Sequence, residues 1–226
     1  MNAWYRYYRF LQILIARYTQ TAVAYVEALL QENERIWAQA KKADEAGQPA
    51  TWPVTREELT EMRRMAEIAL TLHLEIESFF VFANILLDRV ASACRYYFWK
   101  RADWNHWQLT HNLEKVCAKK GLHMPDLGLL KMPSELGAKI VAYRNTRVEH
   151  VEEPRLHYAT MWGPDKKPKI YPILLYPTEG EAKSMQKPSG DIDEIMALLD
   201  HYMTSMLDFF DANAEKSVLP PVRPQA

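Results

Sequence analysis

The chain has 226 residues, a length that suits one large domain or two small ones. Because 48% of the residues are hydrophobic, the chain can bury a sizeable core and does not need disulfide bonds or metal ions to fold. Lysine and arginine number 28 against 29 aspartates and glutamates, so the net charge of -1 excludes a global attraction to nucleic acid. Any site for a polyanion must therefore be local. The two cysteines, Cys94 and Cys117, form no CxxC pair and are predicted to be reduced thiols in the core.

No membrane-targeting segment is predicted. Arg6, Arg9 and Arg17 interrupt the apolar residues of the N-terminal region, unlike the pattern of a secretory signal. No run reaches the roughly 18 uninterrupted apolar residues that a membrane span needs. We therefore expect a cytoplasmic protein with no membrane partner.

Residues 4–46 are predicted to form one long helix, because they contain no proline or glycine and apolar residues recur at helical spacing. Gly47 and Pro49 end it. A second helix is predicted to begin at Thr55, which lies three residues before Glu58 in the capping-box pattern, and to continue to about residue 100. Its second half is apolar on most sides, which predicts a central position.

Two shorter helices follow. The third is expected from about Trp104 to Lys120, ending at Gly121. The fourth is expected to begin at Pro133 and Ser134, residue types that are typical of a helix N-terminus, and to end at Pro154, because proline cannot continue a helix. Together with the second helix these form a predicted core bundle over residues 55–153.

The apolar period changes after Pro154. Two aromatic and β-branched segments, separated by residues 163–168, predict a small β-hairpin insertion over residues 155–177. A last helix is expected over residues 191–214, and residues 218–226 form a predicted flexible tail. The predicted fold is therefore all-α: one domain over residues 1–217, a bundle of about five helices, several of them long, with the hairpin before the last helix.

The most informative stretch of the sequence lies in the predicted fourth helix, at residues 143–150. Helical spacing puts Arg144 on a stripe with Gly137, Val141 and Val148, so its guanidinium must be paired or must face a cleft or an interface. His150 is expected about 120° around the helix and about 9 Å further along it. The two can converge if the helix frays near Pro154, or if two copies of the helix meet across a twofold axis.

Arginine and histidine together suit a phosphodiester. A guanidinium offers a permanent planar charge to phosphate oxygens, and an imidazole moves a proton near neutral pH. Such a pair can cleave RNA without a metal, through attack of the 2′-hydroxyl. A structural alternative stays open at this point: Arg144 can form an ion pair between helices, and His150 in a last turn can complement the helix dipole.

Arg144 followed by Asn145 and, five residues later, by His150 resembles the Arg-polar-x(4 to 6)-His signature of the HEPN superfamily. The resemblance covers the motif and the helical layout of residues 55–154. It implies a homodimer whose two motifs face one cleft, with metal-independent endoribonuclease activity in the active members. Glu152 stands where toxin members with a modifiable residue carry a tyrosine, so that variant is not expected.

Carried over residue by residue, the resemblance implies that Arg144 holds the scissile phosphate, His150 transfers the proton and Asn145 orients or binds the substrate. Tyr143 and Arg147 are further candidates for substrate binding. The first hypothesis is therefore an HEPN-like endoribonuclease, acting as a toxin or phage-defence effector on RNA, with an antitoxin or other protein as a possible partner. The second is a non-catalytic helical module that binds a nucleotide or a protein.

A polar line interrupts the apolar half of the second helix. Glu77, Asn84 and Asp88 share a face at helical spacing, and Glu77 and Asn84 are candidates for contacting substrate or pairing with Arg144. The alternative is a narrow solvated face. His73, one turn before Glu77, is predicted to be a satisfied core histidine.

Two further clusters have structural alternatives. The aromatic and basic residues at 4–10 are typical of surfaces that bind single-stranded nucleic acid, but equally of helix docking and dimerisation. His106 and His111 are five residues apart, a spacing that does not put both on one helix face as metal binding requires. The sequence predicts neither a metal nor a cofactor, and it contains no phosphate-binding glycine loop.

Overall fold

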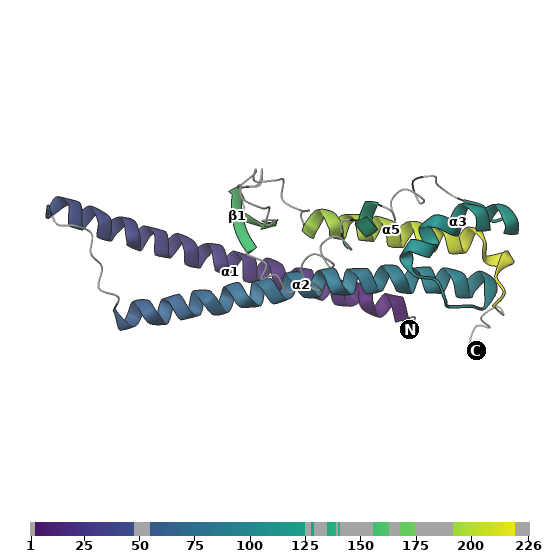
Figure 1. The fold of residues 1–226 in the computed structure, drawn as a ribbon, viewed down its shortest axis with the longest axis horizontal. Helices are drawn as coiled ribbons and strands as arrows, with labels where there is room; N and C mark the ends of the chain where they lie inside the picture. The colour runs from purple at the N-terminus through teal and green to yellow at the C-terminus, as the bar shows by residue number, and fades with distance from the viewer. Residues whose placement is uncertain are drawn as a thin grey trace, which may run out of the picture. The chain divides into compact units, whose positions relative to one another are not determined.

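A computed structural model describes residues 3–47, 55–124, 128, 135–138, 140, 156–162, 168–174 and 192–219. Its long elements are helices α1 (Ala3–Glu45), α2 (Arg56–Trp99), α3 (His106–Lys120) and α5 (Ile192–Ala212), and a 3-10 turn at Ala214–Lys216 follows α5 (Figure 1). The part of the chain so described is mostly helical, which confirms the predicted all-α class.

Residue contacts divide the chain into two units, which are described separately. The first, the core unit, comprises Met1–Ile13, Ser78–Pro154 and Ser189–Ala226. The second, the two-helix unit, comprises Leu14–Glu77 and Arg155–Pro188. Helices α1 and α2 each contribute to both units.

The predicted helix ends are confirmed where local chemistry determines them. Thr55 and Glu58 form a reciprocal capping box: the Glu58 carboxylate accepts from the Thr55 N–H at 2.7 Å, and the Thr55 hydroxyl accepts from the Glu58 N–H at 3.2 Å. Gly47 and Gly121 both adopt φ of +61°, the left-handed conformation that glycine takes up at helix C-termini. The third helix begins at His106 instead of Trp104, because the side chain of Asn105 caps it.

In the core unit, α3 runs beside the second half of α2 in the same direction. The backbone N–H of His106, at the start of α3, donates to Oδ1 of Asp88 at 2.8 Å, whereas Nζ of Lys120, at its end, lies 5.5 Å from the centre of the Trp99 ring. The segment that connects the two helices therefore runs back along α2 to the start of α3. Residues 100–105 are long enough for this, because an extended segment of six residues spans about 20 Å.

Helix α5 also runs along the second half of α2. Tyr97 contacts Phe210 and Phe98 contacts Phe209, with ring centroids 5.1 and 5.5 Å apart. Apolar side chains from all three helices form the core of this unit, in accordance with the expected central position of the second half of α2. The fully buried positions include Phe79, Leu86, Leu87, Cys94 and Phe98 on α2, Leu109 and Leu113 on α3, and Ile195, Leu199, Tyr202 and Phe209 on α5.

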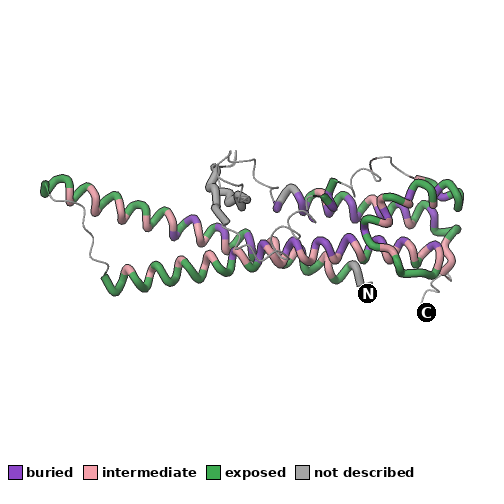
Figure 2. Tube along the Cα trace, in the orientation of Figure 1, coloured by how far each residue is buried: buried purple, intermediate pink, exposed green. Residues whose placement is uncertain are grey.

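The two-helix unit pairs α1 with the first half of α2 in antiparallel orientation. Nε of Arg17 lies 3.1 Å from Oε1 of Glu75 near one end of the pair, and Arg35 forms an ion pair with Glu58 near the other. The buried apolar residues of this helix pair are few, and several are small: Tyr18, Ala22, Val26, Ala28, Leu72 and Ile76. Exposed and intermediate positions predominate along this pair, whereas buried positions concentrate in the core unit (Figure 2).

The C-terminal end of the described chain is tied to the core unit. The backbone N–H of Val218 donates to the carbonyl of Tyr97 at 3.0 Å, and the Ser217 hydroxyl donates to the same carbonyl at 3.3 Å. The predicted tail at 218–226 is therefore corrected at its first residue, because a non-local hydrogen bond that sequence patterns do not reveal attaches Val218.

Two short strands, β1 (Leu156–Trp162) and β2 (Pro168–Leu174), pair in antiparallel register. Leu156 lies opposite Leu174, and Trp162 lies opposite Pro168.

Among the described residues, α2 is the one helix long and apolar enough to cross a membrane by length and composition. Half of its most apolar stretch is buried inside the protein, a pattern that the core helix of a soluble protein also shows.

Candidate functional site

The five candidate residues of the predicted fourth helix lie outside the described residues. These are Tyr143, Arg144, Asn145, Arg147 and His150. The roles expected for them stay predictions from the sequence. What the structure describes is the beginning of their segment and the side chains packed against it.

Glu77 and Asn84, the other two candidates, both lie on α2. Oε1 of Glu77 lies 2.7 Å from Nε2 of His73, and both side chains are partly exposed. Asn84 is 92% buried, since its relative exposure is 8%, and it belongs to the core unit, whereas Glu77 belongs to the two-helix unit. The predicted pairing of His73 is thus seen, but at a half-buried position instead of in the core.

The polar line on α2 has a structural role at Asp88. Its carboxylate accepts a hydrogen bond from the first backbone N–H of α3, where the helix dipole favours a negative charge. The same N-terminus carries the Asn105 cap, which accepts from the N–H of Gln108 at 2.9 Å. Asp88 therefore positions α3 on α2, and along the polar line Asn84 is buried whereas Glu77 and Asp88 are partly exposed.

The segment that leads toward Arg144 is helical at Glu135–Ala138 and at Ile140. Leu136, Gly137 and Ile140 are buried. A Cβ added to Gly137 would lie 2.6 Å from both Cδ2 and Nε2 of His106, so only glycine permits this close approach. Gly137 is the first member of the stripe that the sequence assigns to Arg144.

His106 and Tyr202 form a buried pair of polar rings beside Gly137. Their ring centroids are 6.3 Å apart, and the rings meet edge to face at 89°. The Tyr202 side chain is fully buried, and burial, with a smaller contribution from Cys94, raises the pKa of its hydroxyl far above the usual range. Tyr202 therefore stays neutral near pH 7 and can share a hydrogen bond, but cannot act as a base.

The Tyr202 hydroxyl has no hydrogen-bond partner among the described residues. An unpaired buried hydroxyl costs about 1–3 kcal/mol. Sequence reasoning missed His106 and Tyr202 as neighbours of the motif segment. The available signal was Gly137, because a glycine on a buried helical stripe often marks a close approach.

The N-terminal aromatic residues contact other helices of the core unit, although Tyr5 and Phe10 are 40% and 38% exposed. Tyr7 and Phe10 contact the ring of Phe82 on α2, with centroids 6.1 and 5.6 Å apart. The Tyr8 hydroxyl donates to Oδ1 of Asp200 on α5 at 2.6 Å. These contacts favour helix docking over the nucleic-acid surface for this cluster.

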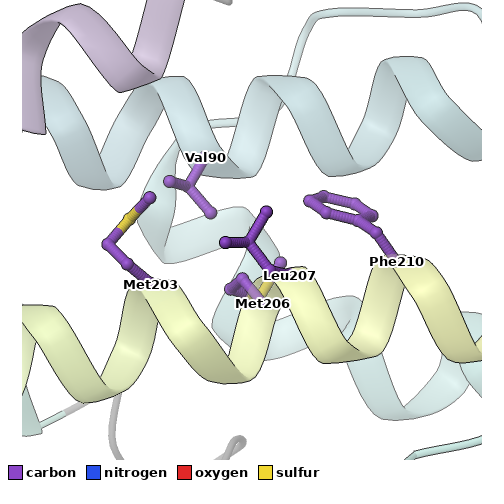
Figure 3. A pocket seen from close by; sticks show the side chains of 5 residues that line it. All are labelled: Val90, Met203, Met206, Leu207 and Phe210. Carbon is purple, nitrogen blue, oxygen red and sulfur yellow. The ribbon is translucent and has the colours of Figure 1, made fainter.

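One hollow in the core unit lies between α2 and α5, and Figure 3 shows the side chains around it. Val90 faces it from α2, and four residues face it from α5: Met203, Met206, Leu207 and Phe210. All five are apolar. The hollow therefore offers no group for acid–base or phosphate chemistry.

The two histidines considered for metal binding are separated by burial. His106 is buried, whereas His111 is exposed, with its ring 4.2 Å from that of Trp107 and Nδ1 2.8 Å from the Trp107 carbonyl oxygen. Within the described ranges, no three or more histidine, cysteine, aspartate or glutamate side chains are grouped to hold a metal ion.

Comparisons with known proteins add no assignment. No protein-family model matches the chain, and the searches of curated proteins and of solved structures give no match. Functional inference therefore depends on the motif in the sequence and on the contacts of the residues described above.

Proposed function

We propose that this protein is an HEPN-like, metal-independent endoribonuclease that acts as a homodimer. The observation that carries the proposal is the sequence Arg144-Asn145-x4-His150, in which Arg144 shares a predicted helical stripe with Gly137. Two features support it: the chain is mostly helical, and Gly137 is buried directly against His106. A segment that begins in such close packing suits a site that must hold its side chains in one geometry.

In the proposed reaction, the Arg144 guanidinium binds the non-bridging oxygens of a phosphodiester. The 2′-hydroxyl oxygen attacks phosphorus and loses its proton, the bond from phosphorus to the 5′-oxygen breaks, and the leaving 5′-oxygen gains a proton. His150 transfers protons in this exchange, because an imidazole does so near neutral pH. The products are a 2′,3′-cyclic phosphate and a 5′-hydroxyl, and Asn145 orients the substrate.

The same proposal includes the wider expectations from the sequence. The two motifs of the homodimer line one cleft, the protein works in the cytoplasm as a toxin or defence effector, and an antitoxin is a possible partner. Its fold is a bundle of about five helices in which the hairpin of residues 155–177 is an insertion. Tyr143 and Arg147 contact the RNA. Glu77 already bonds to His73, so a contact with RNA would require that bond to open.

The test is RNA cleavage by the purified chain in the presence of EDTA. We expect cleavage without a divalent metal and products that end in a cyclic phosphate. His150→Ala should reduce the cleavage rate by at least about 100-fold, which is the usual contribution of a positioned acid–base group. Cleavage that persists in His150→Ala would remove His150 from the mechanism.

His111→Ala is the matched control, because His111 is an exposed histidine on another helix. It should cleave RNA at the rate of the unmodified chain. Equal losses of activity in His111→Ala and His150→Ala would indicate a non-specific effect. The absence of cleavage in the unmodified chain across RNAs of varied sequence would refute the proposal.

A second candidate is a non-catalytic helical module that binds a protein or a nucleotide. The observation that favours it is the set of exposed large apolar side chains on α1 and α2, of which Trp37 is 76% exposed. Under this candidate, Arg144 joins helices instead of binding phosphate. Arg144→Ala should then lower the melting temperature, whereas removal of an active-site arginine is often neutral or stabilising.

A further inference from the structure

The two-helix unit carries a second apolar stripe on each of its helices. On α1 the stripe has a seven-residue period, and on α2 its members are three or four residues apart. Its exposed members are Val23, Leu30 and Trp37 on α1, and Leu59, Met62, Ala66, Leu70 and Leu74 on α2. An antiparallel helix pair needs one apolar stripe per helix for its own contact, so these second stripes are available for association.

Both exposed stripes lie on the same side of the helix pair. Seen along α1 from its N-terminus, the exposed stripe is rotated by about a third of a turn from the buried positions around Tyr18 and Ala22, in the direction in which the helix winds. Seen along α2 from its own N-terminus, the exposed stripe is rotated by the same amount and in the same direction from Leu72 and Ile76. Because the two helices run in opposite directions, equal rotations bring both stripes to one face, which we name the apolar face.

The ion pairs between the helices define the levels on this face. From the pairs Arg17–Glu75 and Arg35–Glu58, Val23 lies level with Leu70, and Leu30 lies level with Met62. Leu70 is 69% exposed and Met62 is 55% exposed. The apolar face thus consists of matched levels, one residue from each helix.

Charges of opposite sign border the two edges of the apolar face. Glu27 and Glu34 lie beside the stripe of α1, seven residues apart, and Arg56 and Arg63 lie beside the stripe of α2, also seven residues apart. All four side chains are exposed, and none forms an ion pair with another described residue. The edge on α1 is therefore acidic, and the edge on α2 carries two arginines and one exposed glutamate, Glu67, which lies about 40° further around the helix from the stripe than Arg63 does.

We propose that the apolar face binds the same face of a second copy of the chain, forming a four-helix bundle around a twofold axis parallel to the helices. This axis puts α1 of each copy over α2 of the other. It does not shift residues along the helix axes, so residues that are level within one copy are also level across the interface. Val23 then meets Leu70 of the second copy. Each acidic edge meets the edge that carries the arginines, with Glu27 within one helical turn of both Arg63 and Glu67, and Glu34 within one turn of Arg56.

The charges on α1 favour this axis over the alternative. A twofold axis across the helices would put α1 over α1, and the like charges of Glu27 and Glu34 would oppose one another. The face is about 32 Å long, since it extends over the 22 residues from Ala16, an exposed residue seven positions before Val23, to Trp37, and two helices are about 20 Å wide. Each copy would bury on the order of 600 Å², near the lower end of stable interfaces.

The experiment is sedimentation velocity on the full chain at low salt, about 50 mM, where charge pairing is weakly screened. We expect the unmodified chain to associate. Two double variants should each halve the mass of the assembly, or raise its dissociation constant at least about tenfold: Glu27→Lys with Glu34→Lys, and Arg56→Glu with Arg63→Glu. In a dimer of either double variant, charges of the same sign would face one another at both edges.

The decisive step is to mix the two double variants. At one edge of the mixed dimer the new lysines meet the new glutamates, and at the other edge the native charges meet, so association should return to the level of the unmodified chain. Leu70→Gln, at a position exposed in the single chain, should weaken association without lowering helicity by circular dichroism. Glu57→Lys with Lys42→Glu, two exposed charges away from the face, should change nothing.

An unmodified chain that stays monomeric would overturn the proposal, as would double variants that associate normally or a mixture that fails to recover. The proposal is independent of ribonuclease activity, because the readout is mass and every substitution lies in the two-helix unit. A dimer without cleavage would refute only the proposed function. Cleavage by a chain that does not associate through this face would refute only the bundle.

Discussion

Gly137 lies so close to the imidazole of His106 that the position a Cβ would occupy is 2.6 Å from two ring atoms. Alanine normally stabilises a helix relative to glycine by about 0.8–1 kcal/mol. Here the ring is buried between Gly137 and Tyr202, so the overpacking cost of about 1–3 kcal/mol should exceed that gain. We expect Gly137→Ala to lower the free energy of unfolding, as measured by urea denaturation.

The same substitution in a His106→Ala background is the control. With the ring absent, alanine at position 137 should become stabilising by about 0.5–1 kcal/mol, because only its helix propensity remains. If Gly137→Ala has the same effect in both backgrounds, the contact with His106 does not explain the glycine.

Asn213 joins the end of α5 to the chain after α3. Its side-chain oxygen accepts from the His123 N–H at 2.6 Å, and its amide donates to the carbonyls of His123 and Phe209, each at 2.8 Å. Asn213→Ala should lower the free energy of unfolding by about 2–4 kcal/mol, because buried backbone groups lose their partners. Asn112→Ala, which removes one amide bond to the Gln108 carbonyl within a helix, should cost less than about 1 kcal/mol.

The hydroxyl of Tyr8 should produce a stability loss at alkaline pH. Burial, followed by the hydrogen bond to Asp200, raises its pKa from 10.0 to about 12. The folded state therefore holds the proton more tightly than the unfolded state. Stability from this group is fully present below pH 10 and is lost as the pH rises toward 12.

The measurement for Tyr8 is melting temperature against pH, compared between the unmodified chain and Tyr8→Phe. Other groups that titrate in this range contribute equally to both proteins. The difference between the two curves should stay constant below pH 10 and shrink between pH 10 and 12. A constant difference up to pH 12 would contradict the raised pKa.

Neither cysteine should react with thiol reagents in the folded protein. Cys94 and Cys117 are free and buried, and burial raises the pKa of both thiols, that of Cys117 to about 11. At pH 8 we expect no reaction of the native chain with Ellman's reagent, and two thiols per chain in denaturant. Rapid reaction before unfolding would show that the core around α3 opens easily.

Several features were predictable from the sequence because they depend on neighbours along the chain. The capping box of Thr55 and Glu58 and the left-handed turns at Gly47 and Gly121 follow from backbone groups within a few residues. The pair His73–Glu77 follows from a spacing of four on one helix. The period of apolar residues likewise predicted which half of α2 is central.

Contacts between distant segments were not predictable in this way. Nothing near Asp88 indicates that its carboxylate receives the first N–H of α3, and nothing near His106 indicates that its ring fills the space beside Gly137. The same holds for the exposed stripes on α1 and α2, because the periodicity of a helix identifies an apolar face but not what covers it.

The sequence alone determined that this protein is built from long helices and where most of them begin and end, and it predicts a further helix that carries an arginine and a histidine suited to a phosphodiester. Those properties depend on hydrogen bonds and periodicities within single helices. The tertiary structure decided which faces meet, which polar groups are buried, and that matched apolar levels with opposite charges form one face. Such relationships arise only when distant segments pack, because packing depends on shape and level in three dimensions.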